Sequence, residues 1–223
     1  MKTVLLHASN EPVSVSKILC IGQNYASHAK EMKSDIPTSP VFFLKPATAL
    51  LDNGGAVVLP SISNDVHHEV EMTVLIGIGG SNITRERALK HVLGYGIGLD
   101  MTMRDVQNEA KKKGQPWTLA KGFDTSAPAS EFVPAEAVGD PGTLSVELKV
   151  NGTVRQSSST ANLIFPIDVL IAYISQFITL ERGDIIYTGT PEGVSRVHPG
   201  DRLEAHLKKM DGSVLTSLSV SVR

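Results

Sequence analysis

His67-His68-Glu69-Val70-Glu71 lies near the start of residues 66–78, a stretch that becomes apolar and β-branched after Glu71. The composition of this stretch predicts a strand over residues 69–78. Successive side chains of a strand point to opposite faces, so Glu69 and Glu71 should share one face while the residues between and after them point into packing. The sequence therefore predicts two carboxylates side by side on a strand whose other face is packed.

A third carboxylate follows a second apolar run, because Asp100 comes directly after a strand predicted over residues 95–99. Oxygen ligands in this number suit Mg²⁺ or Mn²⁺, which keep positions open for water and substrate, better than they suit zinc, which favours Cys and His. Glu69, Glu71 and Asp100 are therefore candidate ligands of one divalent cation. The alternative is two solvated glutamates on a strand edge and an aspartate that caps the next helix, and the Glu-x-Glu pattern taken alone favours that alternative.

The bulk composition predicts one domain in a reducing compartment. The chain has 223 residues, 41% of them hydrophobic, so we expect one domain over residues 1–223 with a short N-terminal segment, about residues 1–15, packed on it. A formal charge of -2 argues against nucleic acid or an anionic membrane as a partner. The single cysteine, Cys20, has apolar neighbours and is expected to be a buried strand residue. With no recognisable secretory signal or membrane span, a cytoplasmic protein is expected.

Short strands separated by Pro and Gly dominate the predicted secondary structure. They are expected over residues 3–6, 17–21, 41–44, 57–59, 69–78, 95–99, 185–188 and 202–207, and Asn151-Gly152 predicts a hairpin between residues 145–150 and 153–156. Helices are expected over residues 25–33, 84–92, about 102–113 and 167–177, with Thr84 as an N-cap. Because the helices do not alternate with strands as a βαβ series requires, the sequence predicts a β-rich α+β fold.

His28 and Glu31 lie three residues apart on the helix predicted over residues 25–33 and should face the same side. A carboxylate beside an imidazole fixes its tautomer and raises its basicity, which suits the pair to take a proton from water. In isolation, the pattern favours an ordinary surface ion pair. Both interpretations stay open on these two residues alone.

Several further side chains could reach a bound anion. Arg104 and Gln107 share a three-residue spacing on the next helix, and arginine can bind a carboxylate in a planar, bidentate way. Lys45 and Lys121 lie in apolar surroundings, where a lysine is costly unless paired, so each either binds negative charge or extends its ammonium group to solvent. The turn Thr188-Gly189-Thr190-Pro191-Glu192-Gly193 could offer N–H groups and hydroxyls to an anion.

Six motifs resemble, in order and spacing, those of the fumarylacetoacetate hydrolase family across nearly the whole chain. They are Gly22-Gln23-Asn24-Tyr25, Phe43-Leu44-Lys45-Pro46, His67-His68-Glu69-Val70-Glu71, Gly98-Leu99-Asp100, Arg104-Asp105-Val106-Gln107 and Thr188-Gly189-Thr190-Pro191. The stretch of residues 111–121, KKKGQPWTLAK, looks especially like the small acylpyruvase subgroup, which acts on short 2,4-dioxo acids and on oxaloacetate. The resemblance implies a mixed β-sheet roll with peripheral helices, usually paired as a homodimer.

The resemblance also implies roles for individual residues. The metal ligands would be Glu69, Glu71 and Asp100, the water-activating dyad His28 and Glu31, and the active-site lysine Lys121. Residues around the substrate would be Arg104, Gln107, Lys45 and Thr190, whereas His68 would neighbour the ligands without binding the metal. The implied cofactor is one Mg²⁺ or Mn²⁺ per subunit. One departure is Gln23, which stands where relatives often carry Arg or Lys, and this loss of charge bears on substrate preference.

The function implied by the resemblance is metal-dependent hydrolysis of a C–C bond in short 2,4-dioxo acids of the acylpyruvate or fumarylpyruvate type. The activity could extend to oxaloacetate, by decarboxylation or tautomerisation, because these reactions pass through related charge distributions. Within the family, the alternative is a 2-hydroxyhepta-2,4-diene-1,7-dioate isomerase or a 5-carboxymethyl-2-oxo-hex-3-ene-1,7-dioate decarboxylase. The alternative of another class is a non-catalytic, metal-containing binding protein.

Overall fold

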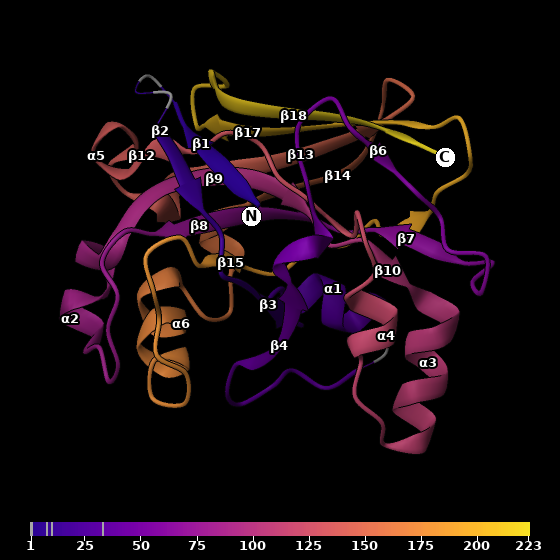
Figure 1. Cartoon of the computed structure of the whole chain (residues 1–223), viewed down its shortest axis with the longest axis horizontal. Coiled ribbons are helices and arrows are strands. Elements are labelled where there is room, and N and C mark those ends of the chain that lie inside the picture. Colours follow the sequence, from indigo (N-terminus) through magenta and orange to yellow (C-terminus); the bar gives the residue numbers. More distant parts are fainter. Residues whose placement is uncertain (1, 8, 10, 33) are drawn as a thin grey trace.

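The computed structural model describes residues 2–7, 9, 11–32 and 34–223, and two sheets form its body, one above the other in Figure 1. The six-stranded sheet has the order β12 (Val133–Pro134), β9 (Val92–Leu99), β8 (Val70–Ile76), β15 (Ile185–Tyr187), β3 (Lys17–Gly22), β4 (Val41–Pro46). The five-stranded sheet has the order β14 (Thr153–Ser159), β13 (Leu144–Val150), β17 (Arg202–Lys209), β18 (Val214–Val222), β6 (Ala56–Val57). Both sheets contain parallel and antiparallel pairs, so the predicted mixed, β-rich fold is confirmed.

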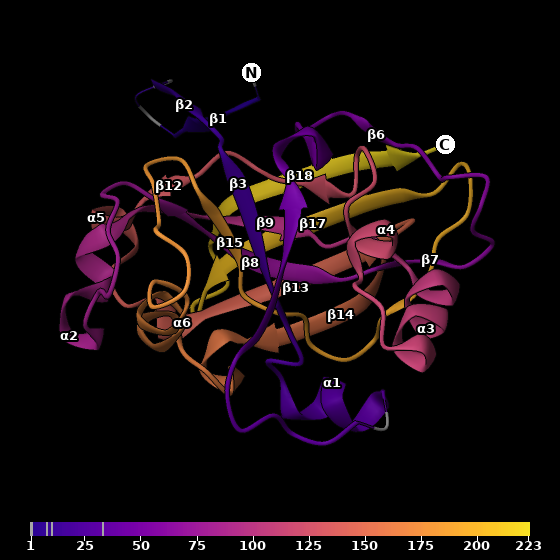
Figure 2. The same ribbon diagram turned by 60° about the horizontal axis from the view of Figure 1, so that its bottom comes forward.

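Small sheets and short helices surround this body. The small sheets are β1 (Thr3–Leu6) with β2 (Glu11–Ser14), β11 (Ala127–Pro128) with β5 (Leu50–Leu51), and β10 (Thr102–Met103), β7 (Val66–His68) and β16 (Ser195–Arg196). The α-helices are α1 (Ala26–Glu31), α2 (Arg85–Ala88), α3 (Arg104–Lys113), α4 (Thr118–Lys121), α5 (Ala135–Val138) and α6 (Ile167–Ile174). Single 3-10 turns span Ala47–Ala49, Leu89–His91, Pro141–Thr143 and Thr160–Asn162. Figures 1 and 2 show α2 and α6 at one end of the six-stranded sheet and α3 and α4 at the other. In the described part of the chain, no helix is long and apolar enough to cross a membrane.

The main core lies between the two sheets. β8 is buried along its whole length, and Met72 and Val74 pack in the same cluster as Leu148 and Leu207 of the five-stranded sheet. Alternate residues of β3 and β8 belong instead to a second cluster, which also holds apolar side chains of the β1–β2 hairpin. Each fully buried aliphatic side chain contributes about 1.5–3 kcal/mol, and β8 contributes such side chains to both clusters.

The glycines of β9 make room for a buried tyrosine. Gly98 alternates with core residues of the strand and faces the opposite side, where a Cβ would lie 2.6 Å from the ring of Tyr187 and 2.9 Å from the carbonyl oxygen of Pro128. Tyr187 is completely buried, and its hydroxyl donates to that same carbonyl at 2.9 Å. The absence of a side chain at position 98 therefore lets β15 and β9 be bridged by one aromatic ring across β8.

Most of the predicted elements are confirmed, including the hairpin. Asn151 and Gly152 have φ angles of 51° and 79°, as a tight two-residue turn requires, and β13 pairs with β14 as predicted. Two boundaries near the carboxylates are wrong. The strand predicted over residues 69–78 is interrupted at Glu69, which lies between β7 and β8, and β8 ends at Ile76. The helix predicted from about residue 102 begins at Arg104, because β10 first pairs with β7.

Other predicted elements are shorter than expected. The helix predicted over residues 84–92 consists of α2 and a 3-10 turn, Val92 already starts β9, and the Thr84 side chain makes no capping hydrogen bond. The helix predicted over residues 167–177 ends at Ile174, and the strand predicted over residues 57–59 is reduced to β6. Of the helix predicted over residues 25–33, α1 accounts for Ala26–Glu31, and its expected last residue, Lys33, lies outside the described residues. β18 was not predicted, and Cys20 is buried as expected.

Replacement of Gly98 by alanine should destabilise the protein. The new methyl group would overlap the Tyr187 ring and a backbone carbonyl, and overpacking of this kind costs about 1–3 kcal/mol. Urea denaturation should give a lower free energy of unfolding for Gly98→Ala. Gly22→Ala in β3 is the matched control, because a Cβ there has its nearest neighbour at 3.6 Å. Equal stability of the two variants would contradict the packing argument.

Candidate active site

The antiparallel pairing of β8 with β9 brings the three predicted metal ligands together. Glu71 pairs with Gly98, and the backbone N–H of Asp100 donates to the carbonyl of Glu69 at 2.8 Å. The start of β8 therefore lies beside the residue that follows β9. One carboxylate oxygen from each of Glu69, Glu71 and Asp100 lies within 4.8 Å of the others, and the three residues are at most 5% exposed.

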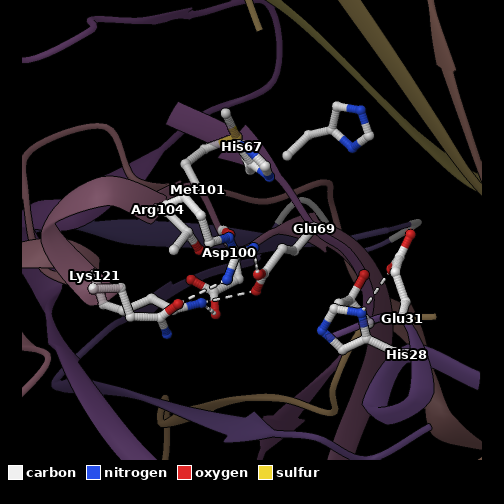
Figure 3. Close-up of polar contacts among 12 residues, drawn as sticks. His28, Glu31, His67, Glu69, Asp100, Met101, Arg104 and Lys121 are labelled. Carbon is white, nitrogen blue, oxygen red and sulfur yellow. Dashed lines mark hydrogen bonds and ion pairs between the residues drawn. The ribbon is translucent and has the colours of Figure 1, made fainter. Parts of the chain in front are cut away.

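Two buried cations, Lys121 and Arg104, pair with part of this negative charge (Figure 3). Lys121 Nζ donates to Glu69 Oε2 at 2.8 Å and to Asp100 Oδ2 at 2.6 Å, and Arg104 Nη2 donates to the other oxygen of Glu69. Burial raises the pKa of the Glu69 carboxyl, but the charges of Lys121 and Arg104 outweigh it and hold that pKa well below its ordinary value. For Lys121, burial alone would lower the pKa of the ammonium group, but the charges of Asp100 and Glu69 outweigh burial, and the pKa is raised. Glu69 and Lys121 are therefore both ionised.

Lys45 is fully engaged by the protein itself. Its ammonium group donates to the carbonyls of Met101 and Ser126, at 3.1 and 2.9 Å, and to the carbonyl of Lys121. It also lies 2.8 Å from Asp100 Oδ1, as an ion pair without hydrogen-bond geometry. An ammonium group has three N–H donors, and here three carbonyls accept them. This geometry favours a role in holding Asp100 over the contact with substrate that was predicted for Lys45.

Within the described part of the chain, Glu71 is the one carboxylate of the three without an ion pair. Its Oε2 accepts a hydrogen bond from the backbone N–H of Gly189 at 2.7 Å. Burial, with the nearby charges of Asp100 and Glu69, raises the pKa of the Glu71 carboxyl well above its ordinary value. A divalent cation would remove this like-charge repulsion, and carboxylate oxygens suit hard cations. The residues present therefore fit a divalent metal.

His28 and Glu31 on α1 form the predicted pair. His28 Nδ1 lies 3.2 Å from Glu31 Oε2, and His28 is 6% exposed. When Nδ1 donates to the carboxylate, the other ring nitrogen is an acceptor, and in Figure 3 it points toward the carboxylate cluster. Glu31 also accepts from the backbone N–H of Gly193 at 3.0 Å, and the Ser27 hydroxyl donates to Glu192. The turn after β15 thus fastens α1, and two of its N–H groups, those of Gly189 and Gly193, donate to carboxylates of the protein itself.

One small cavity collects eight of the ten predicted site residues. These are His28, Glu69, Glu71, Asp100, Arg104, Gln107, Lys121 and Thr190, whereas Glu31 and Lys45 are not among its lining residues in the described chain. The cavity has a volume of about 30 Å³, roughly the room for one water, because paired side chains fill it. A larger, mostly apolar groove of about 790 Å³ runs along β4 but contains none of the three carboxylates.

A network centred on Gln156 was not predicted. Gln156 lies on the polar hairpin arm β14 but is 1% exposed, and its amide nitrogen donates to Thr190 Oγ1 at 2.9 Å. Its amide oxygen accepts from Val70 N–H at 3.0 Å and pairs with His68 Nδ1 at 2.9 Å, while His68 Nε2 lies 2.8 Å from Ser195 Oγ. His68 therefore has both ring nitrogens occupied, in line with its expected place beside the ligands. A glutamine in a polar strand gives no sequence signal of this burial.

Lys111 is a second residue that the sequence analysis did not single out. It lines the cavity from α3, two turns after Arg104. Here the sequence does contain a signal, because Arg104, Gln107 and Lys111 follow the spacing of one helix face. Because positions 111–113 are all lysine, residue type alone does not distinguish Lys111, which lines the cavity, from Lys112 and Lys113, which do not.

Comparison with known proteins gives the class of protein that this fold and site define. Residues 17–220 match the family described as fumarylacetoacetate (FAA) hydrolase C-terminal, and the chain belongs to this family. The chain is 49% identical over 203 residues to the mitochondrial oxaloacetate tautomerase FAHD1 of Rattus norvegicus, which covers 89% of this chain and 92% of that protein. It is 50% identical over 204 residues to the oxaloacetate tautomerase YcgM of Escherichia coli strain K12, with 91% and 92% covered.

Solved structures agree with this assignment. The fumarylpyruvate hydrolase from Pseudomonas aeruginosa, solved in complex with Mn²⁺ and pyruvate, superposes with a TM-score of 0.93 at 39% identity, over 99% of this chain and 95% of that one. A putative fumarylacetoacetate isomerase/hydrolase from Oleispira antarctica superposes with a TM-score of 0.94 at 39% identity, over the full length of both chains. The family predicted from the six motifs is therefore confirmed.

Replacement of Glu71 by glutamine should separate two effects of the carboxylate cluster, the repulsion that destabilises the fold and the binding of a metal that stabilises it. The pKa of Glu71 is raised in the folded protein, so the protonated carboxyl contributes its full stability at a pH below the ordinary carboxyl pKa. This contribution decreases as the pH rises and is lost above the raised pKa. At neutral pH with a chelator, Glu71→Gln should therefore be at least as stable as the wild type. With Mn²⁺ at 100 times its dissociation constant, the wild type should gain about 5–10 °C in Tm and the variant much less.

Thermal denaturation with chelator and with MnCl₂ measures both effects. Glu131→Gln is the control, because Glu131 is an exposed carboxylate paired with His7 and should respond to Mn²⁺ as the wild type does. An equal Mn²⁺-dependent rise for Glu71→Gln would exclude Glu71 as a ligand.

Proposed function

We propose that this protein is a divalent-metal-dependent enzyme that acts on short 2-oxo acids and hydrolyses a C–C bond in 2,4-dioxo acids of the acylpyruvate or fumarylpyruvate type. The observation that carries the proposal is the cluster of three buried carboxylates with a His–Glu pair and two cations around it. Figure 3 shows Glu69 and Asp100 between His28 on one side and Lys121 on the other. A hard-cation site supplies electrophilic assistance, and the His–Glu pair supplies a base. This combination suits substrates that carry an oxo group next to a carboxylate.

Glu69, Glu71 and Asp100 are the residues that would hold one Mg²⁺ or Mn²⁺. When bound, the cation would polarise the 2-oxo group of the substrate and neutralise charge that develops on it. The protein's own part is to keep the three ligands charged and in place. Lys45 holds Asp100, the Gly189 N–H group holds Glu71, and Arg104 and Lys121 hold Glu69.

His28 is the proposed general base. Glu31 accepts a hydrogen bond from His28 Nδ1–H and so keeps the free ring nitrogen toward the cavity. His28 takes a proton from a water, the hydroxyl oxygen bonds to the 4-oxo carbon, and the bond between C3 and C4 then breaks with its electron pair left on C3. His28 returns the proton to C3, so the products are pyruvate and a carboxylic acid. Such general base catalysis is worth about 10² to 10⁴ in rate.

Lys121 and Arg104 are proposed to meet the negative charge of the substrate. Both cations line the cavity and are buried, where their charge acts over a short range with little screening. Lys121 would stabilise the enolate electrons that are left on the pyruvate portion. Arg104, held by Gln107 at 2.7 Å, would face the substrate carboxylate, and Thr190, held by Gln156, would offer its hydroxyl.

Oxaloacetate is the second candidate substrate, and the 49–50% identity to two oxaloacetate tautomerases favours it. In tautomerisation, His28 would remove a proton from C3 to give the enolate and return that proton to the enolate oxygen, so the same base and the same enolate stabilisation would serve. Decarboxylation would use the enolate stabilisation alone. An isomerase or decarboxylase for longer dicarboxylates of the dioate type remains a proposal of the same class. His28, with its partner Glu31, and Lys121 meet at one cavity, and this argues against a non-catalytic binding protein.

A His28→Ala variant should bind the metal as the wild type does but turn over substrate much more slowly. Calorimetric titration with Mn²⁺ should give wild-type affinity, while turnover of acetylpyruvate falls on the order of 10²- to 10⁴-fold, because the base is absent. Glu71→Ala should lose metal binding and metal-dependent turnover together. His206→Ala on β17, in the other sheet, is the control and should behave as the wild type. Wild-type turnover by His28→Ala would show that the dyad assignment is wrong.

The reaction itself can be identified by products, with Mn²⁺ and with a chelator. Acetate and pyruvate from acetylpyruvate would report hydrolysis, CO₂ and pyruvate from oxaloacetate would report decarboxylation, and a change in enol absorbance without a new product would report tautomerisation. Turnover of none of these substrates, nor of fumarylpyruvate, would contradict the proposed function.

A further inference from the structure

Lys111 is one of the cations that line the active-site cavity. Its neighbours Lys112 and Lys113 both pair with Glu109 on the outer face of α3. In the described part of the chain, no ion pair joins Lys111 to an acidic side chain, although Lys111 lines the same cavity as the three carboxylates. Arg104, Lys121 and Lys45 are each paired with Glu69 or Asp100. Lys111 is therefore the cation of the cavity that has no carboxylate partner among the described residues.

The geometry of α3 directs this charge toward the site. Lys111 lies seven residues after Arg104, about 10 Å along the helix axis, and side chains of a helix lean toward its N-terminus. The long Lys111 side chain thus extends back toward Arg104 rather than away from it. Burial and the nearby charge of Arg104 lower the pKa of Lys111, which fits an ammonium group close to the other cations.

Aromatic rings fix the position of Lys111 at the rim of the cavity. Its Nζ lies 5.1 Å from the centroid of the Trp117 ring, within the range of a cation–π contact. Trp117 packs edge-on against Phe43 at 5.7 Å, and Phe43 lies 4.9 Å from Lys121 Nζ. A series of ring contacts thus leads from Lys111 through Trp117 and Phe43 to Lys121. Gln23 also lines the cavity and adds an amide without charge.

We propose that Lys111 binds the distal carboxylate of a 2-oxo dicarboxylic acid, so that the site prefers dicarboxylates of the oxaloacetate or fumarylpyruvate class over uncharged acylpyruvates. The proposal rests on the proposed function, because it takes the carboxylate and oxo group at the other end of the substrate to be held by the metal site and Arg104. A second carboxylate would then meet Lys111 at the rim, where the charge is otherwise unmatched. Lys111 is accordingly a specificity-determining residue and takes no part in bond breaking.

The test compares two substrates of the Mn²⁺-loaded protein that differ in the distal group, oxaloacetate with a carboxylate and acetylpyruvate with a methyl ketone. Lys111→Met should lower kcat/KM for oxaloacetate about tenfold to a hundredfold, mainly through KM, which is the range of a hydrogen bond to a charged group. It should lower kcat/KM for acetylpyruvate far less. Lys111→Arg should recover most of the oxaloacetate activity. Lys112→Met is the matched control and should leave both substrates as in the wild type, because Lys112 pairs with Glu109 outside the cavity.

Binding of malate and lactate separates this proposal from the proposed function. These two 2-hydroxy acids differ only in the distal carboxylate for the present purpose, and neither requires turnover to be measured by calorimetry. The wild type should bind malate more tightly than lactate, and Lys111→Met should lose that preference. If no substrate is turned over but the Lys111-dependent preference is present, the proposed function fails and the role of Lys111 stands. If Lys111→Met affects oxaloacetate and acetylpyruvate equally, or affects neither, and malate is not preferred, the role of Lys111 is overturned.

Discussion

The register of β8 against β9 is the constraint on which the rest of the site depends. It places Glu71 opposite Gly98 and Glu69 beside Asp100, so three carboxylates meet at the edge of an apolar core. Such a cluster is unfavourable unless each charge is matched. The surrounding structure supplies the match for two of them with buried lysines and an arginine, and for Glu71 with a backbone N–H group. The remaining repulsion is what a divalent cation would relieve.

The other parts of the fold converge on this cluster. The turn after β15 fastens both Glu71 and the α1 helix that carries the His–Glu pair, so the base and the ligands are positioned by one loop. Gln156 joins β14, β8 and Thr190 and so connects the five-stranded sheet to the cavity. Two packed sheets thus hold a small polar site whose groups are all fixed by neighbours. Lys111 differs from these groups because it lies at the rim and remains unpaired in the described structure.

Sequence patterns predicted what local physics determines. Asn151-Gly152 fixed its own hairpin, and alternation along residues 69–78 gave two glutamates on one face, although the strand is interrupted at Glu69. The family and its candidate site residues followed from six spaced motifs, and the cavity collects most of them. The sequence could not predict long-range pairing, such as that of β10 with β7, which shortens α3 at its start. It also could not show that Gln156 is buried, or that Lys45 is saturated by carbonyls, because both facts depend on distant backbone.

The most direct measurement of the central claim is anomalous X-ray diffraction from crystals of the protein grown with Mn²⁺. The account predicts one Mn²⁺ per chain, bound by oxygens of Glu69, Glu71 and Asp100, with Lys121 and Arg104 still beside Glu69. An anomalous peak at another position, or no peak while the three carboxylates keep the contacts described above, would contradict the claim that this cluster is a metal site.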